Sequence, residues 1–171
     1  MAFIARLLRL FGMVTWIGGL IFFAFVEAPT AFHVMGTTRQ FAELIGGSID
    51  AINHLGLLSG LVFIGASLLL WRVSGSRERK LLVTETLLVA LMLVATAYVQ
   101  LHIVPAMERD RESVGGDINS VPADNPARAD FDRLHRASET IEGSALFLGL
   151  GVILLMAVED SRRDLPAAVT R

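Results

Sequence analysis

The chain has 171 residues, of which 53% are apolar and 19% are charged, with a formal net charge of −2 and no cysteine. The length suits one domain, and the apolar share is higher than that of an ordinary soluble domain. The lack of cysteine excludes disulfides, thiolate metal sites and thiol catalysis, and no basic patch supports nucleic-acid binding. The composition therefore predicts membrane-spanning helices.

The first predicted span covers residues 10–27 and follows Arg6 and Arg9. A signal peptide is the alternative interpretation of an apolar stretch near the amino terminus. The run is long, however, so we predict a retained span. It closes with Glu27, and Pro29 is expected to end or kink the helix, because proline lacks the backbone N–H and clashes with the preceding turn.

The second predicted span covers residues 52–71 and follows a connection, residues 36–49, that shows partial helical spacing. Gly56 and Gly60 lie about one turn apart within this span. Such a small-residue step allows two helices to approach closely. We therefore predict that both glycines face another helix rather than lipid.

A polar link over residues 72–80 leads to the third predicted span, residues 81–104, which closes before Pro105. Residues 113–128 contain Gly, Pro, Asp and Asn without an apolar period, so we predict a mobile outer loop there. The fourth span is predicted over residues 139–158. It continues a helix that starts outside the membrane, and a polar tail follows it.

Four spans place both termini on one side of the membrane. Lysine and arginine are more frequent at the chain ends and in the 72–80 link than in the opposite loops, which predicts an N-in, C-in orientation. The predicted fold is thus all-α. It is an integral membrane four-helix bundle with residues 1–171 as a single domain, placed in a bacterial inner (plasma) membrane.

Each predicted span also brings ionisable groups to the outer mouth of the bundle, as counting residues at ~1.5 Å each indicates. His135, Glu139 and Glu142 follow one another at i, i+4 and i+7, so they share one helix face. Imidazole and carboxylate groups from several helices suit iron, manganese or zinc. The candidate metal ligands are Glu27, His54, His102, His135, Glu139 and Glu142.

Other interpretations of this outer cluster remain open. A haem could be held between His54 and either His102 or His135. The same residues could instead form a polar substrate vestibule, or an interfacial hydrogen-bond network that binds nothing, because polar side chains are expected near headgroups. The sequence names no nucleophile beside a pocket, so no catalytic activity is predicted.

Three classes of function follow from these interpretations. The first is a membrane protein that handles a transition metal or haem. The second is a non-catalytic accessory or scaffold subunit, as a homo-oligomer or within a larger membrane complex. The third is small-solute transport, for which a single four-helix unit would need to oligomerise.

Four stretches carry a family resemblance: F-F-A-F-V-E-A-P, N-H-L-G-L-L-S-G, V-Q-L-H-I-V-P-A-M-E-R-D-R and F-D-R-L-H-R-A-S-E-T-I-E-G. Together they resemble a small four-span membrane family known only as a domain of unknown function, whose eukaryotic relatives are the transmembrane protein 205-like proteins, linked to platinum-drug resistance. The resemblance implies a four-helix membrane bundle and points to Pro29, His54, Pro105 and His135. It brings no catalytic activity, and a distant similarity to bacterial copper-resistance membrane proteins favours metal handling.

Overall fold

Four long helical rods make up the protein, as a computed structural model that describes residues 1–163 shows; side chains are described for residues 1–75 and 78–161. The first rod joins α1 (Ala2–Phe22), η1 (Phe23–Glu27) and α2 (Ala28–Met35), and the second is α3 (Arg39–Trp71). The third joins α4 (Ser76–Tyr98), η2 (Val99–Ile103) and α5 (Val104–Ser113). A short 3-10 turn, η3 (Ile118–Ser120), precedes the fourth rod, α6 (Pro126–Arg163).

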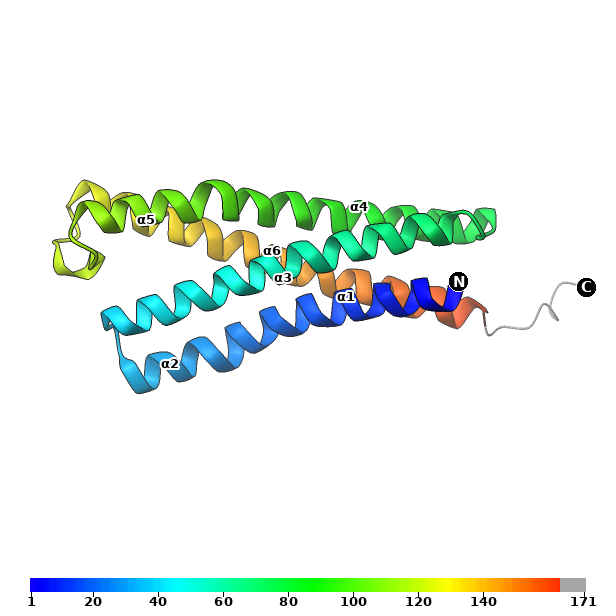
Figure 1. Ribbon diagram of the computed structural model, residues 1–171, viewed down its shortest axis with the longest axis horizontal. Coiled ribbons are helices and arrows are strands. Elements are labelled where there is room, and N and C mark those ends of the chain that lie inside the picture. The colour runs from blue at the N-terminus through cyan, green and yellow to red at the C-terminus, as the bar shows by residue number, and fades with distance from the viewer. Residues whose placement is uncertain (164–171) are drawn as a thin grey trace, which may run out of the picture.

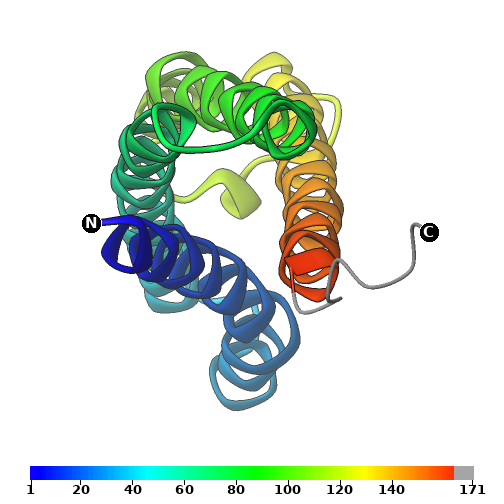
Figure 2. The same cartoon turned by 90° about the vertical axis from the view of Figure 1, so that its right-hand side faces the viewer.

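The rods lie side by side along the long axis of the molecule (Figure 1). One end, called the loop end, carries the α2–α3 and α5–α6 connections; the other, the termini end, carries Met1, the α3–α4 connection and the described end of α6. Viewed along the axis, the rods follow one another in the order α1, α3, α4, α6 (Figure 2). All four rods are long and apolar enough to cross a membrane.

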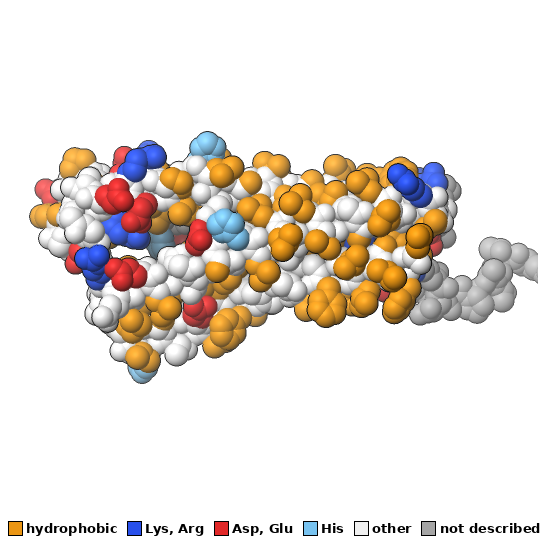
Figure 3. Space-filling view, in the orientation of Figure 1, with side chains coloured by type: hydrophobic (Ala, Val, Ile, Leu, Met, Phe, Trp, Pro, Cys, Tyr) orange, Lys and Arg blue, Asp and Glu red, His pale blue; other side chains and the backbone are white. Residues whose placement is uncertain are grey.

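The all-α, four-span architecture predicted from the sequence is therefore confirmed. Apolar side chains cover much of the middle of the bundle and its termini-end half, whereas charged side chains gather at the loop end (Figure 3). Large apolar residues such as Phe11, Leu61 and Phe147 are exposed on the rods. Such a surface suits lipid rather than water. The side of the membrane on which the termini lie stays a prediction.

Gly56 and Gly60 face another helix, as predicted. A Cβ atom on Gly56 would lie 2.6 Å from Cε2 of Trp16, and one on Gly60 would lie 2.6 Å from Cδ2 of Leu93. The missing side chains thus leave room for the Trp16 indole of α1 and the Leu93 side chain of α4. Small residues let α3 pack closely against both neighbours.

The first helix does not end at Pro29, so that part of the expectation is wrong. A π-helical segment, η1, precedes Pro29, and the rod continues through the proline into α2. The third rod does the same, because η2 precedes Pro105 and the helix continues into α5. A π turn places one extra residue in the turn, which makes room for a ring that would clash with the carbonyl four residues earlier.

The helices also extend beyond the apolar stretches on which their prediction rested. The Thr38 hydroxyl accepts a hydrogen bond from the Phe41 amide (3.2 Å) and so caps α3, which starts at Arg39. Most of the predicted 36–49 connection is therefore helix. In the predicted tail the helix continues to Arg163; residues 164–171 lie outside the described part of the chain.

The first and third rods repeat one pattern. The separation of 76 positions between Arg9 and Glu85 is also the separation between Pro29 and Pro105. The same offset relates three further pairs of buried residues: Met13 and Val89, Trp16 and Met92, and Leu20 and Thr96. The first and third rods thus present equivalent positions to the interior of the bundle.

Candidate functional site

Each rod buries polar side chains along its inward face. Along the third rod the buried positions from Leu82 to Val99 recur at alternating steps of three and four residues, which is the spacing of knobs-into-holes packing. Glu85 occupies one of these positions, and Arg9 on α1 and Asn53 on α3 are buried in the same way. The interior therefore holds ionisable and amide groups as well as an apolar core.

The first polar group, called the termini-end cluster, consists of Arg9, Glu85 and Glu159. Their exposed fractions are only 1%, 0% and 4%. The Arg9 guanidinium donates to the Glu85 carboxylate and to Oε2 of Glu159 (3.2 Å), and it lies 4.8 Å from the Phe63 ring centroid. Arg9 thus joins α1, α4 and α6, with an aromatic face of α3 beside it.

The second polar group, called the loop-end network, consists of Asp50, Asn53, Gln100 and Glu142. The Gln100 amide donates to Asp50, and the Asn53 amide donates to Oε1 of Gln100 (3.4 Å). The Asn53 side chain also lies beside the Glu142 carboxylate. The network therefore connects α3, η2 and α6, and the π turn before Pro105 places Gln100 within its reach.

An apolar core separates the two polar groups. Met13, Trp16, Phe63, Met92 and Val152 are among its fully buried members. The α1 and α6 helices cross in close contact at Gly149, where an added Cβ would lie 2.6 Å from Cγ1 of Ile17.

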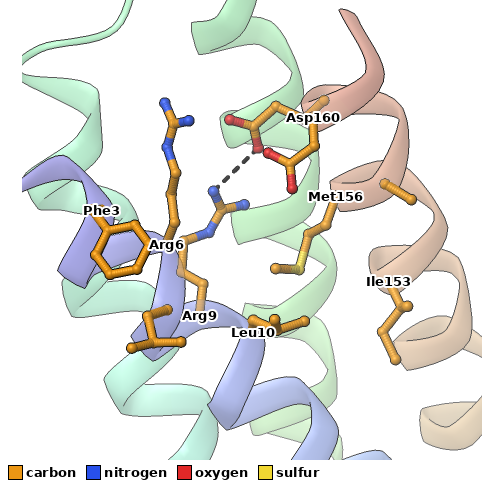
Figure 4. Close-up of a pocket in the computed structure, with 10 residues that line it drawn as sticks. Phe3, Arg6, Arg9, Leu10, Ile153, Met156 and Asp160 are labelled. Carbon is orange, nitrogen blue, oxygen red and sulfur yellow. Dashed lines mark hydrogen bonds and ion pairs between the residues drawn. The ribbon is translucent and has the colours of Figure 1, made fainter. Parts of the chain in front are cut away.

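Two clefts lie between the first rod and α6, one on each side of this crossing. The loop-end cleft has a volume of about 310 Å³ and is lined by Leu20, Phe23, Ala24, Ala28, Glu139, Glu142, Gly143 and Leu146. The termini-end cleft is larger, about 480 Å³, with Phe3, Arg6, Arg9, Met156 and Asp160 among its lining residues. Figure 4 shows the termini-end cleft, with Arg6 and Arg9 on one side and Asp160 on the other.

The histidines predicted to be metal ligands are on the outside of the bundle. His54 is mostly exposed, and its Nδ1 lies 2.9 Å from the carbonyl oxygen of Asp50 on its own helix. His102 is exposed beside Tyr98, with 5.3 Å between ring centroids. His135 is half exposed, stacks on Phe131 and has its Nε2 3.3 Å from Oε1 of Glu139.

The three predicted carboxylate ligands have separate partners. Glu27 accepts a hydrogen bond from the Ser48 hydroxyl, Glu139 pairs with His135, and Glu142 belongs to the loop-end network. Among the described residues, no group of three or more histidine, aspartate and glutamate side chains comes together as a metal-ligand set. The candidate ligands of the predicted outer cluster therefore do not come together at one site in the described part of the chain.

The termini-end cluster is not among the sites predicted from the sequence. In the sequence, Arg9 precedes an apolar run and so resembles a charge that only flanks a membrane span. In the structure it is buried on the same helix face as Ala5, Met13 and Trp16. Glu85 recurs with the buried apolar positions of α4 in the same manner. Counting heptads along the first and third rods would have identified Arg9 and Glu85 as residues that face the interior of the bundle.

Four apolar rods with polar groups inside define a small helical membrane protein. Residues 11–113 match the model of a family described as a domain of unknown function (DUF4149), and the chain belongs to this family. The match runs from α1 to the end of α5, so it includes both π turns, Glu85 and Gln100. No curated protein and no solved structure matches the chain.

Proposed function

We propose that this protein binds small organic cations with an apolar body, which enter the loop-end cleft from the bilayer. The observation that carries the proposal is the position of Glu142. This carboxylate lines a mostly apolar cleft, and ionisable groups within membrane spans are costly unless they have a partner or a function.

The charges around the loop-end cleft favour a cation. Glu139 and Glu142 are the charged side chains among its lining residues, and none of the described residues that line it is a lysine, arginine or histidine. Asn53 gives Glu142 one neutral polar neighbour, whereas an ionised carboxylate has about four acceptor positions. A positively charged ligand supplies the electrostatic partner that the Asn53 amide does not.

The walls of the cleft favour an apolar ligand body. Leu20, Phe23 and Leu146 contribute apolar surface, and Ala24, Ala28 and Gly143 leave space because their side chains are small or absent. Pockets for small molecules combine such apolar walls with a few polar groups that fix orientation. Binding of a small organic cation belongs with the third class of function, small-solute transport. A purely accessory or scaffold protein, in contrast, is expected to show no saturable binding of such a cation.

The test is equilibrium binding of tetraphenylphosphonium to the purified protein in nanodiscs of uncharged lipid. Glu142→Gln removes the charge but keeps the size, and we expect affinity to fall roughly tenfold or more, as for the loss of a charge-assisted contact. Glu112→Gln, an exposed residue of α5 outside the cleft, is the matched control and is expected to bind as the wild type does.

Tetraphenylborate, an anion of nearly the same size and shape, separates charge from apolar contact. We expect it to bind more weakly than the phosphonium to the wild type. Equal binding of the two ions, or equal phosphonium affinity in wild type and Glu142→Gln, would contradict the proposal.

A further inference from the structure

The second and fourth rods repeat a pattern, as the first and third rods do. Five pairs of residues in α3 and α6 are separated by the same number of positions: Asp50 and Glu139, Asn53 and Glu142, Gly56 and Ala145, Gly60 and Gly149, and Phe63 and Val152. The chain therefore contains two equivalent helical hairpins, the first formed by the first and second rods and the second by the third and fourth rods. Equivalent rods lie on opposite sides of the bundle, α1 across from α4 and α3 across from α6 (Figure 2).

The packing between the hairpins follows the same repeat. An added Cβ on Gly60 would lie 2.6 Å from Cδ2 of Leu93 in the third rod. An added Cβ on Gly149 would lie 2.6 Å from Cγ1 of Ile17, which is the equivalent of Leu93 in the first rod. Contacts between the hairpins thus occur twice at equivalent positions, as a twofold axis along the bundle requires.

Two pairs of equivalent residues also contact each other. The Arg9 guanidinium donates to the Glu85 carboxylate, and the Asn53 side chain lies beside the Glu142 carboxylate. A residue meets its own equivalent only close to a twofold axis. Both polar groups in the interior of the bundle therefore lie at the axis that relates the hairpins.

Gln100 fills the space between the third rod and α3 near the loop end. Its amide nitrogen donates to Asp50, and its Oε1 accepts a hydrogen bond from the Asn53 amide (3.4 Å). One amide side chain thus joins two polar residues of α3 to the third rod. The equivalent space lies between the first rod and α6, where the loop-end cleft is.

The loop-end cleft has alanine at the position that corresponds to Gln100. This residue is Ala24, and it lines the cleft with Glu139 and Glu142, which correspond to the two α3 residues that bind Gln100. Alanine carries no hydrogen-bonding side-chain atom, and its small size leaves room within the cleft volume of about 310 Å³. A ligand can therefore take the place in this cleft that the Gln100 amide has between the third rod and α3.

We infer that the cation in the loop-end cleft is a primary ammonium ion whose N–H groups donate to both Glu139 and Glu142. The inference rests on the proposed function and specifies its ligand. Gln100 donates to Asp50 and accepts from Asn53, but both equivalents in the cleft are carboxylates, so a ligand there must donate to each. A primary ammonium has three N–H donors, whereas a quaternary ammonium has none.

Glu139 has capacity for this contact although it also pairs with His135. Its Oε1 lies 3.3 Å from Nε2 of His135, and a carboxylate has about four acceptor positions. Asp50, the equivalent of Glu139, shows the same double use. Its Oδ2 lies 3.5 Å from Nδ1 of His54, while its Oδ1 accepts from Gln100. A carboxylate at this position can thus pair with an exposed histidine and bind an interior donor at the same time.

Two ammonium ions with the same apolar body test the inference: 4-phenylbutylammonium and its N,N,N-trimethyl derivative. Equilibrium binding of each to the purified full-length protein is measured in nanodiscs of uncharged lipid, and empty nanodiscs correct for partition into the lipid. We expect the primary ion to bind roughly tenfold or more tightly, because the trimethylated ion donates no hydrogen bond. Apolar contact alone gives the opposite order, since three methyl groups add apolar surface.

Two variants assign the contacts. Ala24→Gln supplies from the first rod the amide that Gln100 supplies from the third, and we expect it to fill the cleft and weaken binding of both ions at least tenfold. Val26→Gln places the same amide at an exposed position of η1 outside the cleft and is expected to bind as the wild type does. Glu139→Gln is expected to reduce the preference for the primary ion.

Equal affinity for the two ammonium ions, tighter binding of the trimethylated ion, or unchanged binding in Ala24→Gln would each overturn the inference. If tetraphenylphosphonium still binds in a manner that depends on Glu142, the proposed function stands and only the choice of a primary ammonium fails. No saturable binding of any of the three cations would contradict both. Circular dichroism and thermal unfolding verify that each variant is folded, and the comparison of the two ions in the wild type needs no variant.

Discussion

Replacing Gly56 with alanine should destabilise the bundle, because the added methyl group has no space. Its Cβ would lie 2.6 Å from Cε2 and 2.7 Å from Cδ1 of Trp16, whereas ordinary contacts of this kind start at 3.4 Å. The indole is rigid and only 1% exposed, so α1 and α3 must move apart to accept the methyl group. Overpacking of this kind costs about 1–3 kcal/mol.

Gly65→Ala in the same helix is the matched control, since a Cβ at Gly65 would meet nothing within 4 Å. Both substitutions gain the same helix propensity of about 1 kcal/mol. The difference between their free energies of unfolding therefore measures the cost of the close contact with Trp16. We expect Gly56→Ala to be about 1–3 kcal/mol less stable than Gly65→Ala, or roughly 5- to 150-fold in the unfolding equilibrium.

Reversible unfolding in mixed detergent micelles, followed by circular dichroism, measures both variants under the same conditions. Equal stability of the two variants would refute the close α1–α3 packing at Trp16. The same result would also mean that packing does not require a glycine at position 56.

Three further predictions concern the polar groups and the membrane. Arg9→Ala removes the buried guanidinium that binds the Glu85 and Glu159 carboxylates, so we expect a loss of about 3–5 kcal/mol in the same unfolding assay, far more than for an exposed arginine. Reporter fusions at Gly75 and Gly116 should show opposite sides of the membrane, with Gly75 cytoplasmic; a cytoplasmic Gly116 fusion would mean that the orientation is wrong. Metal content measured by elemental analysis should be the same in the wild type and in a His54→Ala, His135→Ala double variant, because both rings face outward; a clear drop would favour the metal hypothesis.

The apolar periodicity predicts the helical bundle because long apolar runs have few other structures in a bilayer. It also predicts the inward position of Gly56 and Gly60, since small residues at helical spacing are useful mainly where helices meet. Glu142 stands out in the sequence because of its place on an apolar helix. Its partner Asn53 does not, because hydrogen bonds between rods depend on how the helices are rotated against one another.

The histidines show why depth alone does not define a site. Counting residues gives the height of His54 and His102 along their helices, but not the side of the helix on which the ring lies. Arg9 and Glu85 show the opposite: they lie at the depth where charged residues usually face the surface, yet both are buried inside the bundle. Only the alternation of buried positions along each rod places them inside.

The most direct measurement of whether the loop-end cleft holds a cation is single-cysteine protection. The chain has no cysteine of its own, so a cysteine at Ala24 reports on the cleft alone, and one at Gly65 reports on an open helix surface. Tetraphenylphosphonium is predicted to slow modification at Ala24→Cys by a small uncharged thiol reagent, in a saturable manner, and to leave Gly65→Cys unchanged. Equal rates with and without the cation at Ala24→Cys, or equal slowing at both positions, would contradict cation binding in the cleft.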